Sequence, residues 1–167
     1  MNSFLSMTVF PLLMIIAGAG DALSMRIPNW LTGLIAVVFF PMALLVGMPW
    51  AAIGLHILVG LGLFIAGFML FALGLFGGGD SKLLAATGLW LGWADLMPFL
   101  VMTALAGAVL ALCVGVWSII NTASEIKDGS IFKHLGTIKP NVPYGYAFAV
   151  GAILAFPDSG WMALAQV

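Results

Sequence analysis

The sequence predicts an all-α integral membrane protein, a bundle of six transmembrane helices. Of its 167 residues 63% are hydrophobic and only 7% are charged, and the mean hydropathy is +1.22. A soluble domain usually carries about 25% charged residues. Five basic and six acidic side chains cannot cover a water-facing surface, so lipid must be the solvent for most of this chain.

Six apolar runs are each expected to form one span, because a helix that crosses a bilayer needs about 20 mostly apolar residues. Proline, glycine or charged residues separate the runs. The predicted spans are residues 4–24, 29–48, 52–76, 81–94, 96–120 and 145–165. No internal repeat and no low-complexity linker is visible, so residues 1–167 are expected to form a single membrane-embedded domain.

The first span is expected to be a retained helix, since the segment before it lacks the positive charge of a signal peptide. The fourth predicted span is short. Its 14 residues would reach only about 21 Å, against a hydrocarbon core of about 30 Å. Either it borrows residues from span five, or it begins below the membrane surface. In the second case the preceding glycines, 77–79, would supply unusual backbone dihedral angles and allow close approach by another segment.

The basic residues predict the orientation, because lysine and arginine collect in cytoplasmic loops. In the six-span layout all five fall on one side: Arg26, Lys82, Lys127, Lys133 and Lys139. That side is therefore expected to be cytoplasmic, with both termini outside. Four tryptophans lie near predicted helix ends, where amphipathic rings favour the interface: Trp30, Trp50, Trp93 and Trp117.

Composition argues against several classes of function. A formal net charge of −1 indicates neither a nucleic acid nor another polyanionic partner. Cys113 is the single cysteine, so it forms no internal disulfide or cysteine metal site, and a small packing residue is expected there. His56 is expected to be packed or hydrogen-bonded. Gly88 and Gly92 form a GxxxG pair, for which internal helix packing is expected rather than dimerisation. We expect no metal and no cofactor.

Asp21 and Asp80 are the acidic residues that end apolar spans on the predicted cytoplasmic side. An ionisable residue inside a membrane is costly and is a functional candidate by default. Two carboxylates that share a pocket separate their pKa values, so one stays protonated while the other acts as a base. Such a pair can activate water against a peptide carbonyl. Two alternatives remain from topology alone: exposed helix caps, and an ion- or proton-coupled transporter with paired intramembrane carboxylates.

Three segments together resemble the type IV prepilin peptidases, which are GxGD membrane aspartyl peptidases. The segment "GGGDSKLLAATGLWLG" (77–92) resembles the GxGD element, and "DALSMRIPNWLT" (21–32) resembles the segment of the first aspartate. The segment "KPNVPYGYAFAVGAILA" (139–155) resembles the third signature, Val-Pro-Tyr-Gly. The three occur in the order of the family and at the ends of the expected spans.

This resemblance implies an endopeptidase that removes leader peptides from pilin-like precursors at the cytoplasmic membrane face. It implies that Asp21 and Asp80 are the catalytic pair. Supporting positions follow from the same motifs: Gly77, Gly79, Lys82, Arg26, Pro143 and Tyr144. Basic residues often found after the first aspartate are replaced here by Leu23 and Met25, leaving Arg26 as the nearby cation.

The resemblance also implies the partners. The substrate would be a helical, membrane-inserted prepilin, with the lipid bilayer around it and pilus assembly machinery as a further partner. Larger relatives carry a cysteine-rich cytoplasmic insertion and N-methylate the new terminus. This chain has one cysteine and no such insertion, which places it beside the short forms of Flp/Tad pilus systems, without N-methylation.

Overall fold

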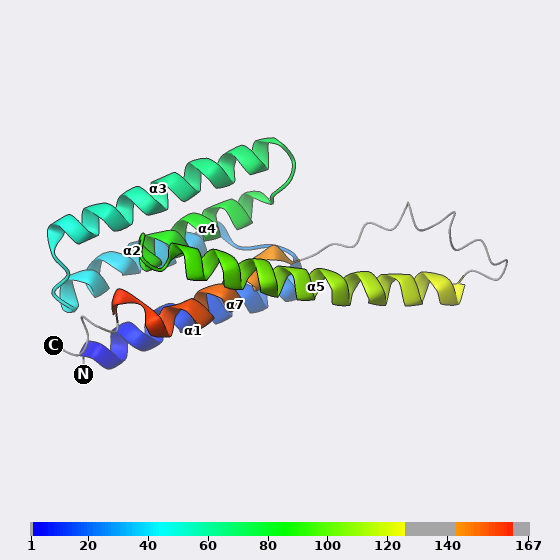
Figure 1. Ribbon diagram of the computed structural model, residues 1–167, viewed down its shortest axis with the longest axis horizontal. Coiled ribbons are helices and arrows are strands. Elements are labelled where there is room, and N and C mark those ends of the chain that lie inside the picture. The colour runs from blue at the N-terminus through cyan, green and yellow to red at the C-terminus, as the bar shows by residue number, and fades with distance from the viewer. Residues whose placement is uncertain (1, 126–142, 162–167) are drawn as a thin grey trace.

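The computed structural model describes residues 2–125 and 143–161, and every element in them is helical (Figure 1). The elements are α1 (Asn2–Ser24), α2 (Asn29–Leu45), α3 (Trp50–Ala72), α4 (Gly78–Leu91), α5 (Leu96–Glu125), α7 (Tyr144–Ala155) and a 3₁₀ turn (Phe156–Asp158). The all-α prediction is therefore confirmed for the described part of the chain. The lysines predicted in the last loop, at positions 127, 133 and 139, lie outside it.

Two helices are long and apolar enough to cross a membrane by themselves, Trp50–Ala72 and the Leu96–Asn121 part of α5. Three shorter apolar helices accompany them: Thr8–Ser24, Asn29–Leu45 and Tyr144–Ala155. Six separate spans thus stay a prediction. Several predicted ends are wrong: α5 continues to Glu125, whereas α2, α3, α4 and α7 stop before their predicted ends, at Leu45, Ala72, Leu91 and Ala155. The later part of α5 extends beyond the other helices (Figure 1).

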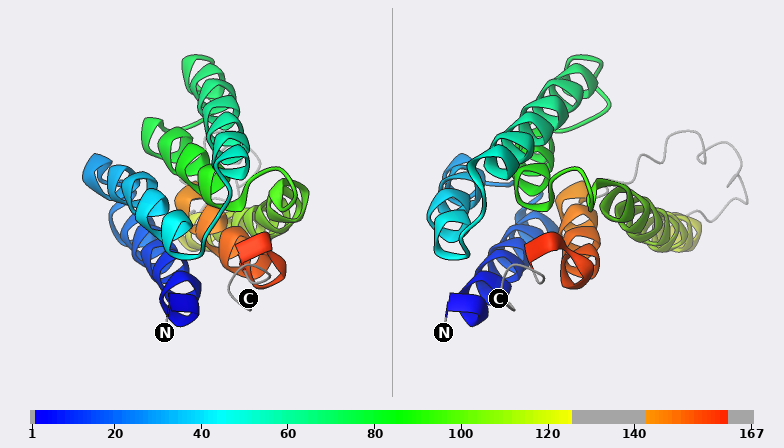
Figure 2. Two further views of the ribbon diagram at one scale, coloured as in Figure 1. Left: turned by 90° about the vertical axis from the view of Figure 1, so that its left-hand side faces the viewer. Right: turned by 60° about the vertical axis from the view of Figure 1, so that its left-hand side comes forward.

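The short helix α4 is the centre of the bundle. Helices α2, α3 and α7 pack on it (Figure 2), and nine of its 14 residues are buried. It does not borrow residues from the next helix, because it ends at Leu91 and Gly92 turns the chain with a φ of 68°. A helix surrounded by protein does not need to span the lipid by itself, and α4 is accordingly short.

Glycines bring α3 and α4 into close contact. A Cβ on Gly67 would lie 3.1 Å from the Cα of Ser81, and a Cβ on Gly88 would meet the side chain of Leu63. The Ser81 hydroxyl donates a hydrogen bond of 2.8 Å to the Gly67 carbonyl. Small residues let membrane helices approach in this way. The predicted internal packing of Gly88 is confirmed.

An aromatic cluster fills the core at the end of α4 that is remote from Asp80. Phe10 stacks on Trp90, and Trp90 stacks on Trp161, each with ring centroids 4.9 Å apart. The Trp90 indole donates to the Ile35 carbonyl at 2.8 Å. His56 bonds the Leu89 carbonyl through Nδ1 at 2.8 Å, so the prediction of a hydrogen-bonded histidine is confirmed.

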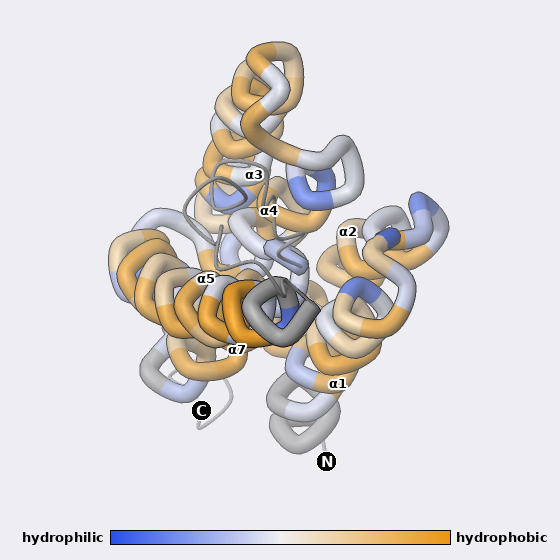
Figure 3. The backbone as a smooth tube through the Cα atoms, turned by 90° about the vertical axis from the view of Figure 1, so that its right-hand side faces the viewer, coloured by the Kyte–Doolittle hydropathy of each residue, from blue (hydrophilic) through white to orange (hydrophobic). Residues whose placement is uncertain are grey.

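Much of the outer surface is apolar, most visibly along α5 (Figure 3). The four tryptophans expected at the membrane interface are all exposed, between 66% and 77%: Trp30, Trp50, Trp93 and Trp117. Cys113 is exposed on α5, so its expected role as a packing residue is wrong. An exposed apolar surface of this extent indicates contact with lipid.

The contact between Gly67 and Ser81 yields a test of the fold. The Gly67→Val substitution forces branched carbons against the backbone of Ser81, and overpacking typically costs about 1–3 kcal/mol. We expect a clearly lower melting temperature of the purified protein in detergent. Gly62→Val is the matched control, because a Cβ on Gly62 of the same helix would meet nothing within 4 Å. Equal melting temperatures for the two variants would contradict the close α3–α4 contact.

Candidate active site

Asp21 is buried in the last turns of α1, where its carboxylate meets the beginning of α7. It is 5% exposed. Its Oδ2 accepts a hydrogen bond of 2.8 Å from the backbone N–H of Gly145, and the Tyr146 amide also interacts with it. The first N–H groups of a helix have no partner inside the helix and carry partial positive charge. The α7 N-terminus therefore supplies hydrogen-bond donors for the carboxylate of Asp21.

The local sequence leaves the Gly145 amide for Asp21, while the Tyr146 N–H also donates to the Pro143 carbonyl at 3.2 Å. Pro143 occupies the N-cap position of α7 with extended backbone (φ −74°, ψ 90°) and offers no side-chain cap. A serine, threonine or aspartate there would usually accept the N–H of the second or third helical residue. In this fold a carboxylate from another helix takes that place. The motif Pro-Tyr-Gly thus begins a helix without a side-chain cap, and Asp21 accepts the hydrogen bond of its Gly145 N–H.

Gly145 permits this approach because it lacks a side chain. A Cβ at this position would lie 2.8 Å from Asp21 Oδ2 and 2.6 Å from Ile27 Cδ1. One helical turn away, a Cβ on Gly18 would lie 2.6 Å from the Cβ of Ala149. The two close contacts bring the backbones of α1 and α7 together at the level of the carboxylate.

Asp80 lies in the first turn of α4, and its carboxylate faces the same place from the other side. Its Oδ2 accepts the Gly77 N–H at 3.3 Å. Asp80 also interacts with the backbone amide of Gly145 and, electrostatically, with Asp21. Two carboxylates separated by 59 positions in the sequence thus meet around one backbone amide.

A cavity of about 530 Å³ opens beside Asp80. It is lined by the segment that follows α1 and by the start of α4, namely residues 25–29 and 77–80. Asp80 and Arg26 are both among the lining residues, whereas the buried carboxylate of Asp21 is not. Asp80 is therefore the aspartate that lines the cavity, and Asp21 lies behind it at the start of α7.

The glycines before Asp80 behave differently from the expectation of unusual backbone angles. Gly77 is the extended N-cap of α4 with a φ of −75°, and Gly78 and Gly79 already belong to the helix. The described glycines with positive φ lie elsewhere, at positions 47, 74 and 92. The expected close approach does occur, because a Cβ on Gly79 would lie 3.2 Å from the Cβ of Ile27.

Of the other supporting positions, three lie at the start of α7 or at the cavity, and one, Lys82, bonds elsewhere. Tyr144 stacks on Phe76 with centroids 5.9 Å apart and ties α7 to the chain before the glycines. Pro143 caps α7, and Arg26 is exposed at the cavity. Lys82, by contrast, donates a hydrogen bond of 2.8 Å to Asn29 Oδ1 rather than to either aspartate. This bond joins the start of α2 to α4.

Sequence reasoning missed two residues of the site, Gly145 and Ile27. Ile27 is 8% exposed, and its side chain fills the space between Gly79 on α4 and Gly145 on α7. The sequence signal for this contact is the glycine at the end of each motif, Gly79 in Gly-Gly-Gly and Gly145 in Pro-Tyr-Gly, because a glycine permits close approach by another segment. Within the described residues no cluster of histidine, cysteine or acidic side chains has the arrangement of a metal site.

Comparison with known families decides the class of this site. The model of the type IV leader peptidase family matches residues 8–112, which include both aspartates. The chain belongs to the type IV leader peptidase family. It is therefore a peptidase, and its apolar helices mark this peptidase as a membrane protein. Neither the curated proteins nor the solved structures gave a match.

The Gly145 contact predicts a strong effect of a single methyl group. In Gly145→Ala the added Cβ must displace the Asp21 carboxylate or Ile27, so we expect peptidase activity to fall at least about tenfold, or about 1.4 kcal/mol in the activation barrier. Gly20→Ala is the control, because it adds the same group next to Asp21 where nothing lies within 4 Å. Rates for a leader-bearing precursor measure the effect; wild-type activity in Gly145→Ala would contradict the described geometry.

Proposed function

We propose that this leader peptidase is an aspartyl endopeptidase that cleaves Flp-type prepilins at the cytoplasmic face of the bacterial inner membrane. The observation that supports it best is the meeting of Asp21 and Asp80 around the Gly145 amide. Asp21 is buried and Asp80 is half-buried, and both interact with the same backbone amide. The pilus assembly machinery is the partner that would receive the product.

The chemistry begins with one proton shared between the two carboxylates. Two adjacent anionic carboxylates in a poorly hydrated site repel each other, so the singly protonated pair is favoured. The Gly145 N–H stabilises a negative charge on Asp21, whereas Asp80 faces the cavity. The titration belongs to the pair and not to either residue alone.

Hydrolysis then needs a water molecule held between the pair. The ionised carboxylate removes a proton from this water while its oxygen forms a bond to the scissile carbonyl carbon. The protonated carboxyl group gives its proton to the carbonyl oxygen. In the second step the C–N bond breaks and the leaving nitrogen takes the proton that came from water. As the carbonyl re-forms, a hydroxyl group of the tetrahedral intermediate returns a proton to the carboxylate that lost its proton in the first step, which restores one proton on the pair.

The substrate must present an extended peptide bond to this pair. In a helix each carbonyl is already hydrogen-bonded and the chain is wrapped by its own side chains. The precursor is therefore proposed to be helical in the bilayer and unwound at its leader junction, beside residues 77–80. In the proposed six-span orientation this end of the bundle is cytoplasmic and both termini are outside.

Substitution of each aspartate tests the proposal directly. In Asp21→Asn and Asp80→Asn the amide keeps the size of the side chain but cannot act as acid or base. Acid–base catalysis usually contributes 10²–10⁴-fold, so cleavage of a co-expressed Flp-type prepilin should fall by at least about 100-fold in each variant. The shortened precursor is measured by immunoblot or mass spectrometry.

The control is the same substitution at Asp95, which lies beyond the other end of α4 and accepts a hydrogen bond from the Gly160 N–H. Asp95→Asn should cleave at the wild-type rate. Near-normal cleavage by either Asp21→Asn or Asp80→Asn would show that the two carboxylates do not form a catalytic pair. If the wild type carried ions across proteoliposomes but cleaved no precursor, and both aspartate variants lost this ion flux, the transporter alternative would be favoured.

A further inference from the structure

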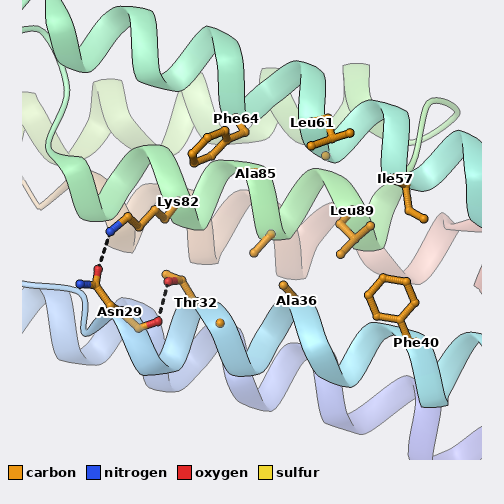
Figure 4. Close-up of a pocket in the computed structure, with 13 residues that line it drawn as sticks. Asn29, Thr32, Ala36, Phe40, Ile57, Leu61, Phe64, Lys82, Ala85 and Leu89 are labelled. Atoms are coloured by element: carbon orange, nitrogen blue, oxygen red, sulfur yellow. Dashed lines mark hydrogen bonds between the residues drawn. The ribbon is translucent and has the colours of Figure 1, made fainter.

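A second cavity, of about 570 Å³, lies between α2 and α3 with α4 as its floor (Figure 4). Each helix contributes one face at helical spacing. Thr32, Ala36 and Phe40 come from α2, Gly60 and Leu61 from α3, and Ala85 from α4. Nearly all of the lining is apolar. Below, this cavity is called the α2–α4 groove.

The α2–α4 groove leads to the candidate active site. Asn29 lines both the groove and the cavity beside Asp80. Lys82, two residues after Asp80, lines the groove at the same end and donates to Asn29 Oδ1 (Figure 4). The groove and the cavity beside Asp80 therefore adjoin at Asn29, the groove being mostly apolar along the helices.

The size of the groove fits one face of a helix. Asn29 and Phe40 are 11 residues apart on α2, about 16 Å, and a helix cylinder of that length and about 10 Å diameter occupies roughly 1,300 Å³. The groove holds less than half of this volume. Glycine and alanine at positions 33, 36 and 85 leave room for a close backbone approach, as at helix contacts in membranes.

We propose that the α2–α4 groove binds the apolar membrane helix of the precursor. This inference rests on the proposed function and names the part of the substrate that the enzyme holds. The helix lies along α2 with one face on Ala36 and Ala85, and its end reaches Asn29. There the chain leaves the apolar groove and unwinds into the cavity beside Asp80. Recognition of this kind selects precursors in which an apolar helix directly adjoins the cleavage site.

Disulfide cross-linking along the groove tests the position of the helix. Thr32→Cys, Ala36→Cys and Phe40→Cys are placed one at a time in an inactive Asp80→Asn, Cys113→Ser background, and the precursor carries a single cysteine that is scanned along its apolar segment. Each step along α2 is four residues, about 6 Å. The precursor position that reacts best should therefore move by about four residues per step, always in the same direction.

The native Cys113, retained in Asp80→Asn without a groove cysteine, is the control because it is exposed on α5, a helix that contributes no residue to the groove. It should give at most a few per cent of the cross-linked product. Cross-links to Cys113 as strong as those to the groove would overturn the proposal. So would equal reaction along the whole precursor, which is the pattern expected if the groove holds only lipid.

Filling the groove tests its use in catalysis. Ala36→Phe places a ring between α2 and α4, and it should raise the KM for the membrane-inserted precursor at least tenfold while kcat changes less than twofold. Ala111→Phe is the control, since Ala111 is exposed on α5 and lines neither cavity. A wild type that does not cleave the precursor would refute the proposed function. A wild type that cleaves it, with Ala36→Phe at the same KM, would refute the groove alone.

Discussion

The hydrogen bond from the Gly145 N–H to the Asp21 carboxylate is the contact on which the whole site depends. It joins residues 124 positions apart, and it fixes α1 to α7 at the level where Asp80 arrives on α4. A buried carboxylate needs hydrogen bonds in place of lost water. The start of α7 supplies them because its N-cap is a proline without a side-chain acceptor. The same amide interacts with Asp80, so one backbone group positions both acids.

Ile27 explains how three helix ends are kept at the right spacing. Its side chain lies against Gly79 on one side and Gly145 on the other. A longer residue at either glycine would push α4 or α7 away, and a shorter residue at 27 would leave a cavity between them. The segment after α1 therefore has two functions. It lines the catalytic cavity, and it sets the distance between the helices that bear or hold the two aspartates.

Features that depend on neighbouring residues alone could be predicted from the sequence. The starts of α2 and α3 follow Pro28 and Pro49, which are their N-caps, and the two aspartates were visible as rare acids in apolar runs. The end of α5 was missed because no glycine or proline lies next to Glu125, whereas the end of α7 was missed although Pro157 follows Ala155 by two residues. Gly145 was missed for a different reason. Its role comes from a contact with Asp21, and nothing within its own segment requires a residue without a Cβ.

The position of α4 allows an acidic side chain to lie near apolar surroundings. A carboxylate in the middle of a lipid-facing helix would have neither water nor partner. Asp80 avoids this because it stands in the first turn of a short, buried helix, where unpaired N–H groups favour a negative charge. The neighbouring helix α3 is 23 residues long and α4 only 14. The cavity of the candidate active site lies where α4 begins, so the position of Asp80 in the first turn places its carboxylate at this cavity.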